Sequence, residues 1–282
     1  VPLEVALRRF ADQISSRADD HREGIPTGFA TLDAKTGGLQ RSDLILLAGR
    51  PGLGKTSFAL NVVWHAAAMQ NKTCAVFSLE MSELQIVQRL ISMTSEIDGN
   101  RMRRGRLSPD EFRSISLASD ELQKAPIFVE ESSQLSVTDI LAKSRRLQAE
   151  RGLDLVVIDY LQLIEGAGDD ESRVLEVARI SRSLKAVARE LQVPVIALSQ
   201  LSRQIETRGT EPMLSDLRES GALEADADLV MFLWQKDRKD RDDNVVRLKL
   251  AKHRNGPTGD FDLHFQSEVT RFRDLGETRQ DA

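Results

Sequence analysis

The chain has 282 residues, of which 40% are hydrophobic, and this is enough to bury one large core. Its 39 lysine and arginine residues face 44 aspartate and glutamate residues, which excludes an overall positive field for nucleic acid, so any such contact must be local. The single cysteine, Cys74, excludes an internal disulfide and is expected to be a small core residue. Without an apolar run of about 18 residues or a signal-peptide pattern, we expect a cytoplasmic protein with no membrane partner.

Residues 3–17 carry apolar side chains at helical spacing, namely Leu3, Leu7, Phe10 and Ile14. The polar stretch that follows predicts a tether, so we assign residues 1–22 to a helix and tether, 23–276 to one α/β domain and 277–282 to a polar tail. The pattern leaves open whether this helix docks on its own domain or on a neighbouring subunit. Because the chain starts with Val1, we expect it to be part of a longer protein.

A phosphate-binding loop is the strongest signal in the chain. Residues 49–56 fill the pattern G-x-x-x-x-G-K-[ST], between an apolar strand predicted at 44–48 and a helix predicted at 57–69. Such a turn aims backbone N–H groups and a helix N-terminus at an anion. We expect Lys55 to reach the β- and γ-phosphates and Thr56 to bind Mg²⁺. The predicted nucleotide-binding residues are Gly49, Arg50, Pro51, Gly52, Leu53, Gly54, Lys55, Thr56 and Ser57.

Two acidic residues follow predicted strands. A strand at 75–79 leads into Glu80, and a carboxylate there lies in the crevice where open α/β sheets bind ligands. Glu80 could instead be an N-cap or a surface acid before the helix predicted at 83–95. The apolar strand at 155–158 ends in Asp159, which we expect to hold magnesium through its water shell.

The remaining predicted elements alternate between helices and strands up to about residue 200, and the last three, from residue 229 on, are all strands. The predicted helices are 108–123, 137–150 and 174–191, and the predicted strands are 127–130, 195–198, 229–234, 245–251 and 261–265. Parallel βα units followed by hairpins predict an α/β fold with a twisted, mostly parallel sheet, flanked by helices, and antiparallel C-terminal edge strands. The polar residue Gln200 follows the strand at 195–198, again on the ligand side.

Two segments rich in arginine are candidates for contacts with other molecules. Residues 101–106 form the most basic run, which predicts a solvated loop or, alternatively, a phosphate-backbone or subunit contact. Residues 201–223 lack apolar periodicity and carry Arg203, Arg208 and Arg218. Irregular segments of this length in a compact domain are usually functional.

These sites together predict ATP hydrolysis rather than binding alone. Glu80 would orient and deprotonate the attacking water. We find no obvious second cation near the γ-phosphate in the sequence of the same subunit. The segment 252–257, Lys-His-Arg-Asn-Gly-Pro, offers cations that could act on a neighbouring subunit, and such an arginine supplied in trans typically raises the rate about 10³–10⁵-fold.

Several separated motifs, found in the right order across nearly the whole chain, resemble the motor domain of DnaB-type replicative DNA helicases. They are residues 77–82 (Phe-Ser-Leu-Glu-Met-Ser), 158–163 (Ile-Asp-Tyr-Leu-Gln-Leu), 197–203 (Ala-Leu-Ser-Gln-Leu-Ser-Arg), 215–221 (Ser-Asp-Leu-Arg-Glu-Ser-Gly) and 252–257. The resemblance implies a RecA-like P-loop NTPase fold and a homo-hexameric ring. It also implies ATP-driven 5′ to 3′ movement on single-stranded DNA, with Mg²⁺ and ATP bound between subunits.

The resemblance also assigns roles residue by residue. Glu80 resembles the family's catalytic glutamate, Asp159 its magnesium aspartate and Gln200 its γ-phosphate sensor. Arg254 with Lys252 resembles the trans-acting finger pair. The DNA-binding residues implied by the resemblance are Arg218, Glu219, Ser220 and Gly221. Residues 1–17 resemble the linker helix that docks on the next subunit, and the family's N-terminal collar, through which primase and helicase loader would bind, is absent from this sequence.

Two other classes of protein share part of this pattern. One is a RecA-like ATPase of recombination or signalling that does not unwind a fork, and strand displacement on a forked substrate separates it from a helicase. The other is a module that binds ATP only to assemble, which the joint presence of Glu80, Asp159, Gln200 and Arg254 argues against.

Overall fold

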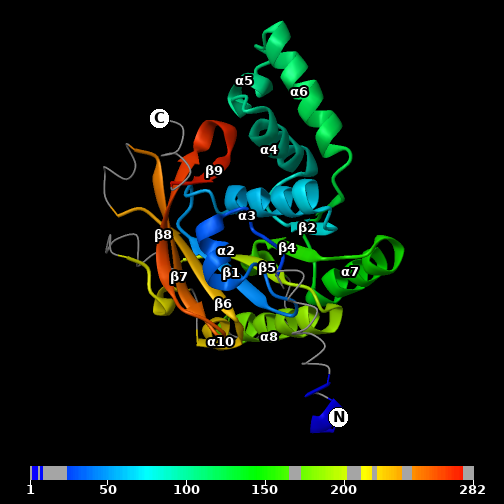
Figure 1. The fold of residues 1–282 in the computed structure, drawn as a ribbon, viewed down its shortest axis with the longest axis vertical. Coiled ribbons are helices and arrows are strands. Elements are labelled where there is room, and N and C mark those ends of the chain that lie inside the picture. Colours follow the sequence, from blue (N-terminus) through cyan, green and yellow to red (C-terminus); the bar gives the residue numbers. More distant parts are fainter. Residues whose placement is uncertain are drawn as a thin grey trace.

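The computed structural model describes residues 2–5, 7–8, 24–164, 173–201, 211–217, 221–236 and 243–275. Within them, one sheet of nine strands has the order β3-β2-β4-β5-β1-β6-β7-β8-β9 (Figure 1). The strands are β1 Leu44–Gly49, β2 Cys74–Ser78, β3 Ile127–Glu131, β4 Leu155–Asp159, β5 Val195–Gln200, β6 Leu229–Trp234, β7 Val245–His253, β8 Gly259–Gln266 and β9 Arg271–Asp274. The α-helices are α2 Ala30–Thr36, α3 Lys55–Trp64, α4 Glu83–Ser95, α5 Gly99–Arg103, α6 Pro109–Leu122, α7 Val137–Arg151, α8 Arg173–Leu191 and α10 Gly221–Asp226.

The order of the strands puts β1 in the middle of the sheet with both of its faces covered. Ile45 and Leu47 belong to a core cluster shared with α2, α3 and α4. Leu44, Leu46 and Ala48 belong to the cluster on the other face, with α7, α8 and α10. Successive strand residues point to opposite faces, so a strand buried on both sides is apolar throughout, as β1 is.

Strands β1 to β6 pair in parallel, and β7, β8 and β9 continue the sheet as antiparallel strands. The predicted fold class, a mostly parallel sheet with antiparallel C-terminal edge strands, is therefore confirmed. We call the edge where the parallel strands end the carboxyl edge, and the edge where they begin the amino edge. Strand β7 runs the other way, so its last residue, His253, pairs with Leu229 at the amino edge.

Three helices begin with the same local signal, a capping box. Ser82, Ser108 and Ser136 each accept a hydrogen bond from the backbone N–H three residues later, and that residue's side chain accepts one from the serine's own N–H. Two otherwise unsatisfied N–H groups are thereby paired at each helix start. Helix α4 accordingly spans the residues that the sequence predicts.

Several short elements differ from the sequence-based expectation. The helix predicted at 57–69 is α3, which begins two residues earlier, followed by a π-helical turn, His65–Met69. Part of the basic run at 101–106 lies in helix α5 rather than in a loop, and Arg101 pairs with Glu111 of α6 at 2.6 Å. Helices α2 and α10 and strand β9 were not predicted, because each has only four to seven residues and shows no clear periodicity.

The ends of the chain and its single cysteine were also the subject of predictions. Residues 3–5 and 7–8 are helical, with Leu3 and Leu7 exposed, whereas Phe10 and Ile14 lie outside the described residues. Cys74 is fully buried, and burial raises the pKa of its thiol to about 12, as suits a core residue. In the described part of the chain, no helix is both long and apolar enough to cross a membrane.

Candidate nucleotide-binding site

The phosphate-binding loop lies between the end of β1 and the start of α3, at the carboxyl edge. Gly52 and Gly54 have φ angles of 81° and 84°, in the left-handed region that favours glycine. A Cβ atom on Gly54 would lie 2.8 Å from the ring of Phe265, which stacks on Phe272 with ring centroids 4.2 Å apart. The stacked rings of Phe265 on β8 and Phe272 on β9 therefore pack against the loop, and only glycine fits at position 54.

Lys55 is the first residue of α3, and its side chain folds back over the loop. Its Nζ donates hydrogen bonds to the carbonyl oxygens of Gly49, at 2.9 Å, and Arg50, at 3.2 Å. Burial lowers the pKa of Lys55, and the negative charges of Asp159 and Glu80 oppose that shift. The ammonium group is thus held inside the loop, where an anion would meet it.

Thr56 and Asp159 meet directly although they are far apart in sequence. The Thr56 hydroxyl donates a 2.7 Å hydrogen bond to Oδ2 of Asp159, a residue that is only 4% exposed. Burial raises the pKa of the Asp159 carboxyl, and the hydrogen bond from Thr56 acts against that rise. One hydroxyl and one carboxylate are oxygen donors of the kind that Mg²⁺ accepts beside nucleotide phosphates, so these residues fit the ion. In the described part of the chain, no group of three or more acidic, histidine or cysteine side chains offers another metal site.

The register of the parallel strands brings the other predicted residues to the same edge. Ser78 pairs with Asp159, and the N–H of Leu79 donates to the Asp159 carbonyl at 2.7 Å, which places the exposed Glu80 beside the loop. Gln200 pairs with Gly49, the first residue of the loop. The alternative that Glu80 caps the next helix is wrong, because Ser82 is the N-cap of α4.

Arg89 is the residue of this site that sequence reasoning missed. It lies half-buried on α4, and its Nη1 donates to Oγ of Ser57, the second residue after Lys55, at 3.4 Å. Burial lowers the pKa of Arg89, and the charges of Asp159 and Glu80 oppose this shift. The sequence shows no obvious second cation for this edge in the same subunit, but α4 packs beside α3 and brings Arg89 close to Ser57, Asp159 and Glu80.

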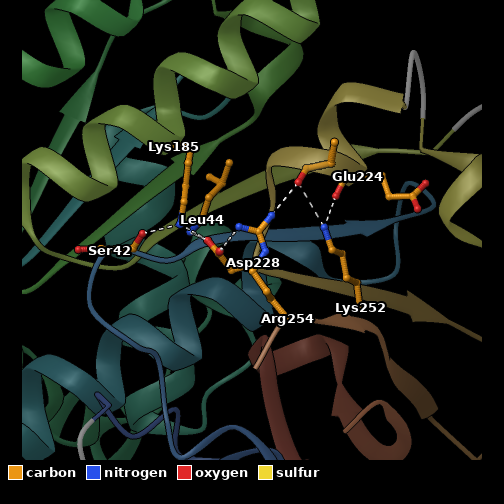
Figure 2. A network of polar contacts seen from close by, with 8 residues as sticks. Ser42, Leu44, Lys185, Glu224, Asp228, Lys252 and Arg254 are labelled. Carbon is orange, nitrogen blue, oxygen red and sulfur yellow. Dashed lines mark hydrogen bonds and ion pairs between the residues drawn. The ribbon is translucent and has the colours of Figure 1, made fainter. Parts of the chain in front are cut away.

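Lys252 and Arg254, which we call the cation pair, are not at this site. They lie where β7 ends, at the amino edge (Figure 2). The N–H of Arg254 donates to the Asp228 carbonyl and the N–H of Leu44 donates to the Asp228 carboxylate, so Arg254 lies beside the start of β1. The loop lies at the other end of that six-residue strand, about 16 Å away at about 3.3 Å per residue.

The predicted DNA-binding residues are only partly described. Arg218, Glu219 and Ser220 lie outside the described residues, as do Arg203 and Arg208. Gly221 is the first residue of helix α10. Helix α10 packs against α8 (Figure 1).

Comparison with known protein families and curated sequences matches this chain to DnaB-like helicases. Residues 24–274 match the DnaB-like helicase C-terminal domain family. The "Replicative DNA helicase DnaB" of Geobacillus stearothermophilus is 48% identical over 262 residues, 91% of this chain and 58% of that protein. The "Replicative DNA helicase DnaC" of Bacillus subtilis is 44% identical, over 96% of this chain and 61% of that protein. The chain thus spans about three-fifths of the length of these curated relatives.

Solved structures agree with the sequence relatives. A structure described as an ATPase domain is 38% identical, with a TM-score of 0.91, and the match covers 97% of this chain and 99% of that one. A second, described as a DnaB-like replicative helicase and its interactions with primase, is 39% identical, with a TM-score of 0.88, over 98% of this chain and 67% of that one. The fold is therefore that of these P-loop ATPase domains, and the chain belongs to the family of DnaB-like helicase C-terminal domains.

Proposed function

We propose that this chain is the motor of an ATP-dependent replicative DNA helicase, which forms a homo-hexameric ring and moves 5′ to 3′ on single-stranded DNA. The observation that carries the proposal is the convergence of Lys55, the Thr56–Asp159 contact and Glu80 at one edge of the sheet. Family membership supports the same function, because the relatives are named replicative DNA helicases.

Each residue at the carboxyl edge has a separate role in ATP hydrolysis. Lys55 binds the β- and γ-phosphates, and Thr56 and Asp159 would hold Mg²⁺, which when bound offsets the negative charge of the phosphates. Glu80 is exposed beside the loop, where it can orient a water molecule and take its proton. Gln200 would sense the γ-phosphate from the neighbouring strand, and Arg89 supplies positive charge from the same subunit.

The cation pair acts on the neighbouring subunit. Arg254 cannot reach the phosphate loop of its own chain, because the length of β1 separates them. Its side chain is 44% exposed and lines an open pocket of about 540 Å³, so it remains accessible to another molecule. In a head-to-tail ring, the amino edge of one subunit would face the carboxyl edge of the next.

The remaining parts of the proposal concern partners. Arg218, Glu219, Ser220 and Gly221 would bind the DNA backbone, and residues 1–22 would link the motor domain, residues 23–276, to the adjacent subunit, leaving 277–282 as a polar tail. Primase and the helicase loader would bind through the N-terminal region that the longer relatives possess. The description of one structural neighbour names its interactions with primase, which supports primase as a partner. A cytoplasmic location follows from replication of DNA in that compartment.

Mixing two inactive variants tests the proposal. Glu80→Gln subunits lack the catalytic acid and Arg254→Ala subunits lack the trans-acting cation, so each is inactive alone. Mixed oligomers contain some interfaces at which an intact Glu80 faces an intact Arg254, and these should hydrolyse ATP. Mixed oligomers, verified by native mass, that are no more active than either parent would overturn the trans arrangement.

Unwinding is tested separately from hydrolysis. ATPase activity stimulated by single-stranded DNA, together with strand displacement on a forked substrate, is the result expected of a helicase. ATP turnover without strand displacement would favour a RecA-like ATPase of recombination or signalling. Binding of ATP without turnover would favour a module that uses the nucleotide only to assemble.

A further inference from the structure

A buried carboxylate, Asp228, lies directly behind Arg254 at the amino edge. Its side chain is 4% exposed, and Oδ2 accepts a 2.9 Å hydrogen bond from the N–H of Leu44 at the start of β1. The same oxygen is paired with the ammonium group of Lys185, which reaches it from α8 and also donates to the Ser42 carbonyl at 2.8 Å (Figure 2). Asp228 is thus held from two sides and has little freedom to move.

Arg254 meets this fixed carboxylate with one end of its guanidinium group. Nη1 lies 3.4 Å from Oδ1 of Asp228, and Nη2 donates a 2.9 Å hydrogen bond to the Ala225 carbonyl. A guanidinium group has five N–H donors in a rigid plane, so two fixed acceptors set its orientation and leave other donors available. Arg254 also lines an open pocket with residues of α8 and α10. Its charged lining includes the cations Arg182, Lys185 and Arg189 and the acids Glu190 and Asp226.

Lys252 is held by carbonyl groups at the C-terminal end of helix α10, the helix whose Ala225 carbonyl also binds Arg254. Its Nζ donates to the carbonyl oxygens of Glu224 and Ala225, the latter at 3.4 Å, so both members of the cation pair share the Ala225 carbonyl. The last carbonyl groups of a helix have no partner within it and carry partial negative charge, which favours cations there. The end of α10 therefore fixes the spacing between Lys252 and Arg254.

We propose that Asp228, itself fixed by Lys185, is a positioning residue that orients Arg254 for the neighbouring subunit, together with the carbonyl groups at the end of α10. This inference rests on the proposed trans action of Arg254. Asp228 touches neither nucleotide nor metal, since it lies at the edge opposite the phosphate loop. Its effect on hydrolysis passes through the direction in which Arg254 points.

The test begins with Asp228→Asn, which keeps the size of the side chain and an oxygen for the N–H of Leu44 but removes the charge. We expect kcat for DNA-stimulated ATP hydrolysis to fall about 10- to 100-fold, the lower part of the range typical of losing one close charge pair. The KM for ATP should stay within about twofold, because Asp228 is remote from the subunit's own nucleotide. Asp154→Asn is the matched control, since Asp154 also accepts a 2.9 Å hydrogen bond from a backbone N–H, that of Thr73, but has no contact with the cation pair.

Complementation separates a positioning role from a general loss of structure. Asp228→Asn subunits have a damaged amino edge and an intact carboxyl edge, so mixing them with Glu80→Gln subunits should restore activity. Mixing them with Arg254→Ala subunits should restore none, because both lesions lie on the same edge. Rescue by Arg254→Ala subunits, or full activity of Asp228→Asn alone, would overturn the inference.

Two further experiments separate failure of the positioning role from misfolding of the variant and from failure of the trans proposal. Asp228→Asn leaves Lys185 buried without its partner, so if that variant does not fold, the double variant Asp228→Asn/Lys185→Met removes both charges and carries the same mixing test. A mixture of Glu80→Gln with Arg254→Ala is run in parallel. If that mixture is inactive, the trans proposal itself fails, whereas if it is active and Asp228→Asn behaves like the parent chain, only the positioning role fails.

Discussion

The two edges of the parallel sheet hold charged groups in different ways. At the carboxyl edge, Lys55 donates a hydrogen bond to a carbonyl group of the phosphate-binding loop, and Glu80 beside the loop is exposed. At the amino edge, Asp228 and Lys185 form a buried pair whose side chains are 4% and 13% exposed. Glu80 at the carboxyl edge is thus open to solvent, whereas at the amino edge the buried Asp228 and the carbonyl groups at the end of α10 hold Lys252 and Arg254 in place.

Arg254→Ala gives the largest expected effect and tests whether the amino edge contributes to catalysis at all. We expect kcat for ATP to fall about 10³- to 10⁵-fold, as for other arginines that act in trans. Nucleotide affinity of the dilute, unassembled chain should not change, because Arg254 is far from its own loop. Titration with a fluorescent ATP analogue checks the affinity, and Arg145→Ala, an exposed arginine of α7, is the control. An equal loss of affinity would place Arg254 at its own subunit's site.

Glu80→Gln and Lys55→Ala divide the carboxyl edge into chemistry and binding. Glu80→Gln should keep ATP binding and lose about 10²- to 10⁴-fold in turnover, because the acid acts only on water. Lys55→Ala should abolish binding, because the lysine carries the charge that meets the phosphates. Calorimetric titration and steady-state ATPase assays measure the two effects. Equal loss of binding in both variants would contradict the role given to Glu80.

Arg89→Met sharpens the comparison, because it removes a cation from the carboxyl edge that the subunit supplies to itself. A lost hydrogen bond from a charged group lowers kcat by about 10- to 100-fold. Unlike Arg254→Ala, this variant should not be rescued by mixing with Glu80→Gln, since both lesions lie on the same edge. Arg146→Met, which alters an exposed arginine of α7 paired with Glu150, should leave turnover unchanged. Rescue by Glu80→Gln would assign Arg89 to a neighbouring site.

Arg218→Ala tests a predicted DNA contact at a residue that lies outside the described part of the chain. Its side chain would contact phosphate rather than bases, so single-stranded DNA should bind more weakly whatever its sequence. The slope of log affinity against log salt should fall by about one contact. Fluorescence anisotropy at several salt concentrations measures it. An unchanged slope in a folded variant would move the DNA contact elsewhere, with residues 101–106 as the next candidate.

Asp43→Asn gives the smallest expected effect. It changes a buried carboxyl group near the amino edge, and the quantity affected is the free energy of unfolding of the chain. Asp43 is 7% exposed. Its burial, and secondly the negative charge of Asp228, raise its pKa to about 6, and the positive charges of Lys185 and Arg254 oppose this rise. The folded state thus binds the proton more tightly than the unfolded state, so the wild-type chain loses stability as pH rises from about 4 to about 6. Asp43→Asn should therefore be more stable by roughly 1–2 kcal/mol at pH 7.5, with the gain vanishing near pH 4. Urea unfolding at both pH values decides this, and an equal gain at both would contradict it.

Local patterns in the sequence were enough to predict the elements that make up the carboxyl edge. Strand β6 spans the predicted residues because it is apolar throughout, and α4 does so because its capping box marks the start. The phosphate loop was predicted from its sequence pattern, and Glu80 and Asp159 were placed beside it because parallel strands end at the same edge. Chain order alone therefore brings Lys55, Glu80 and Asp159 together.

The contacts that were missed depend on how helices pack. Arg89 looks like one more polar residue on the amphipathic helix α4, and only the packing of α4 beside α3 carries it to the loop. The pair of Lys185 and Asp228 joins α8 to the start of β6, two segments that no periodicity links. Helix α10 is too short for a clear pattern, so its contacts with Lys252 and Arg254 could not be foreseen.

The length of β1, which keeps Arg254 away from its own phosphate loop, has a consequence for how many working sites an assembly contains. Under the proposed arrangement a single subunit owns only two halves of different sites. An open chain of n subunits completes n − 1 sites, and only a closed ring completes all of them. Turnover per subunit should therefore fall to nothing on dilution to monomers, and closing the last gap in the ring should add one more active site without any change in composition.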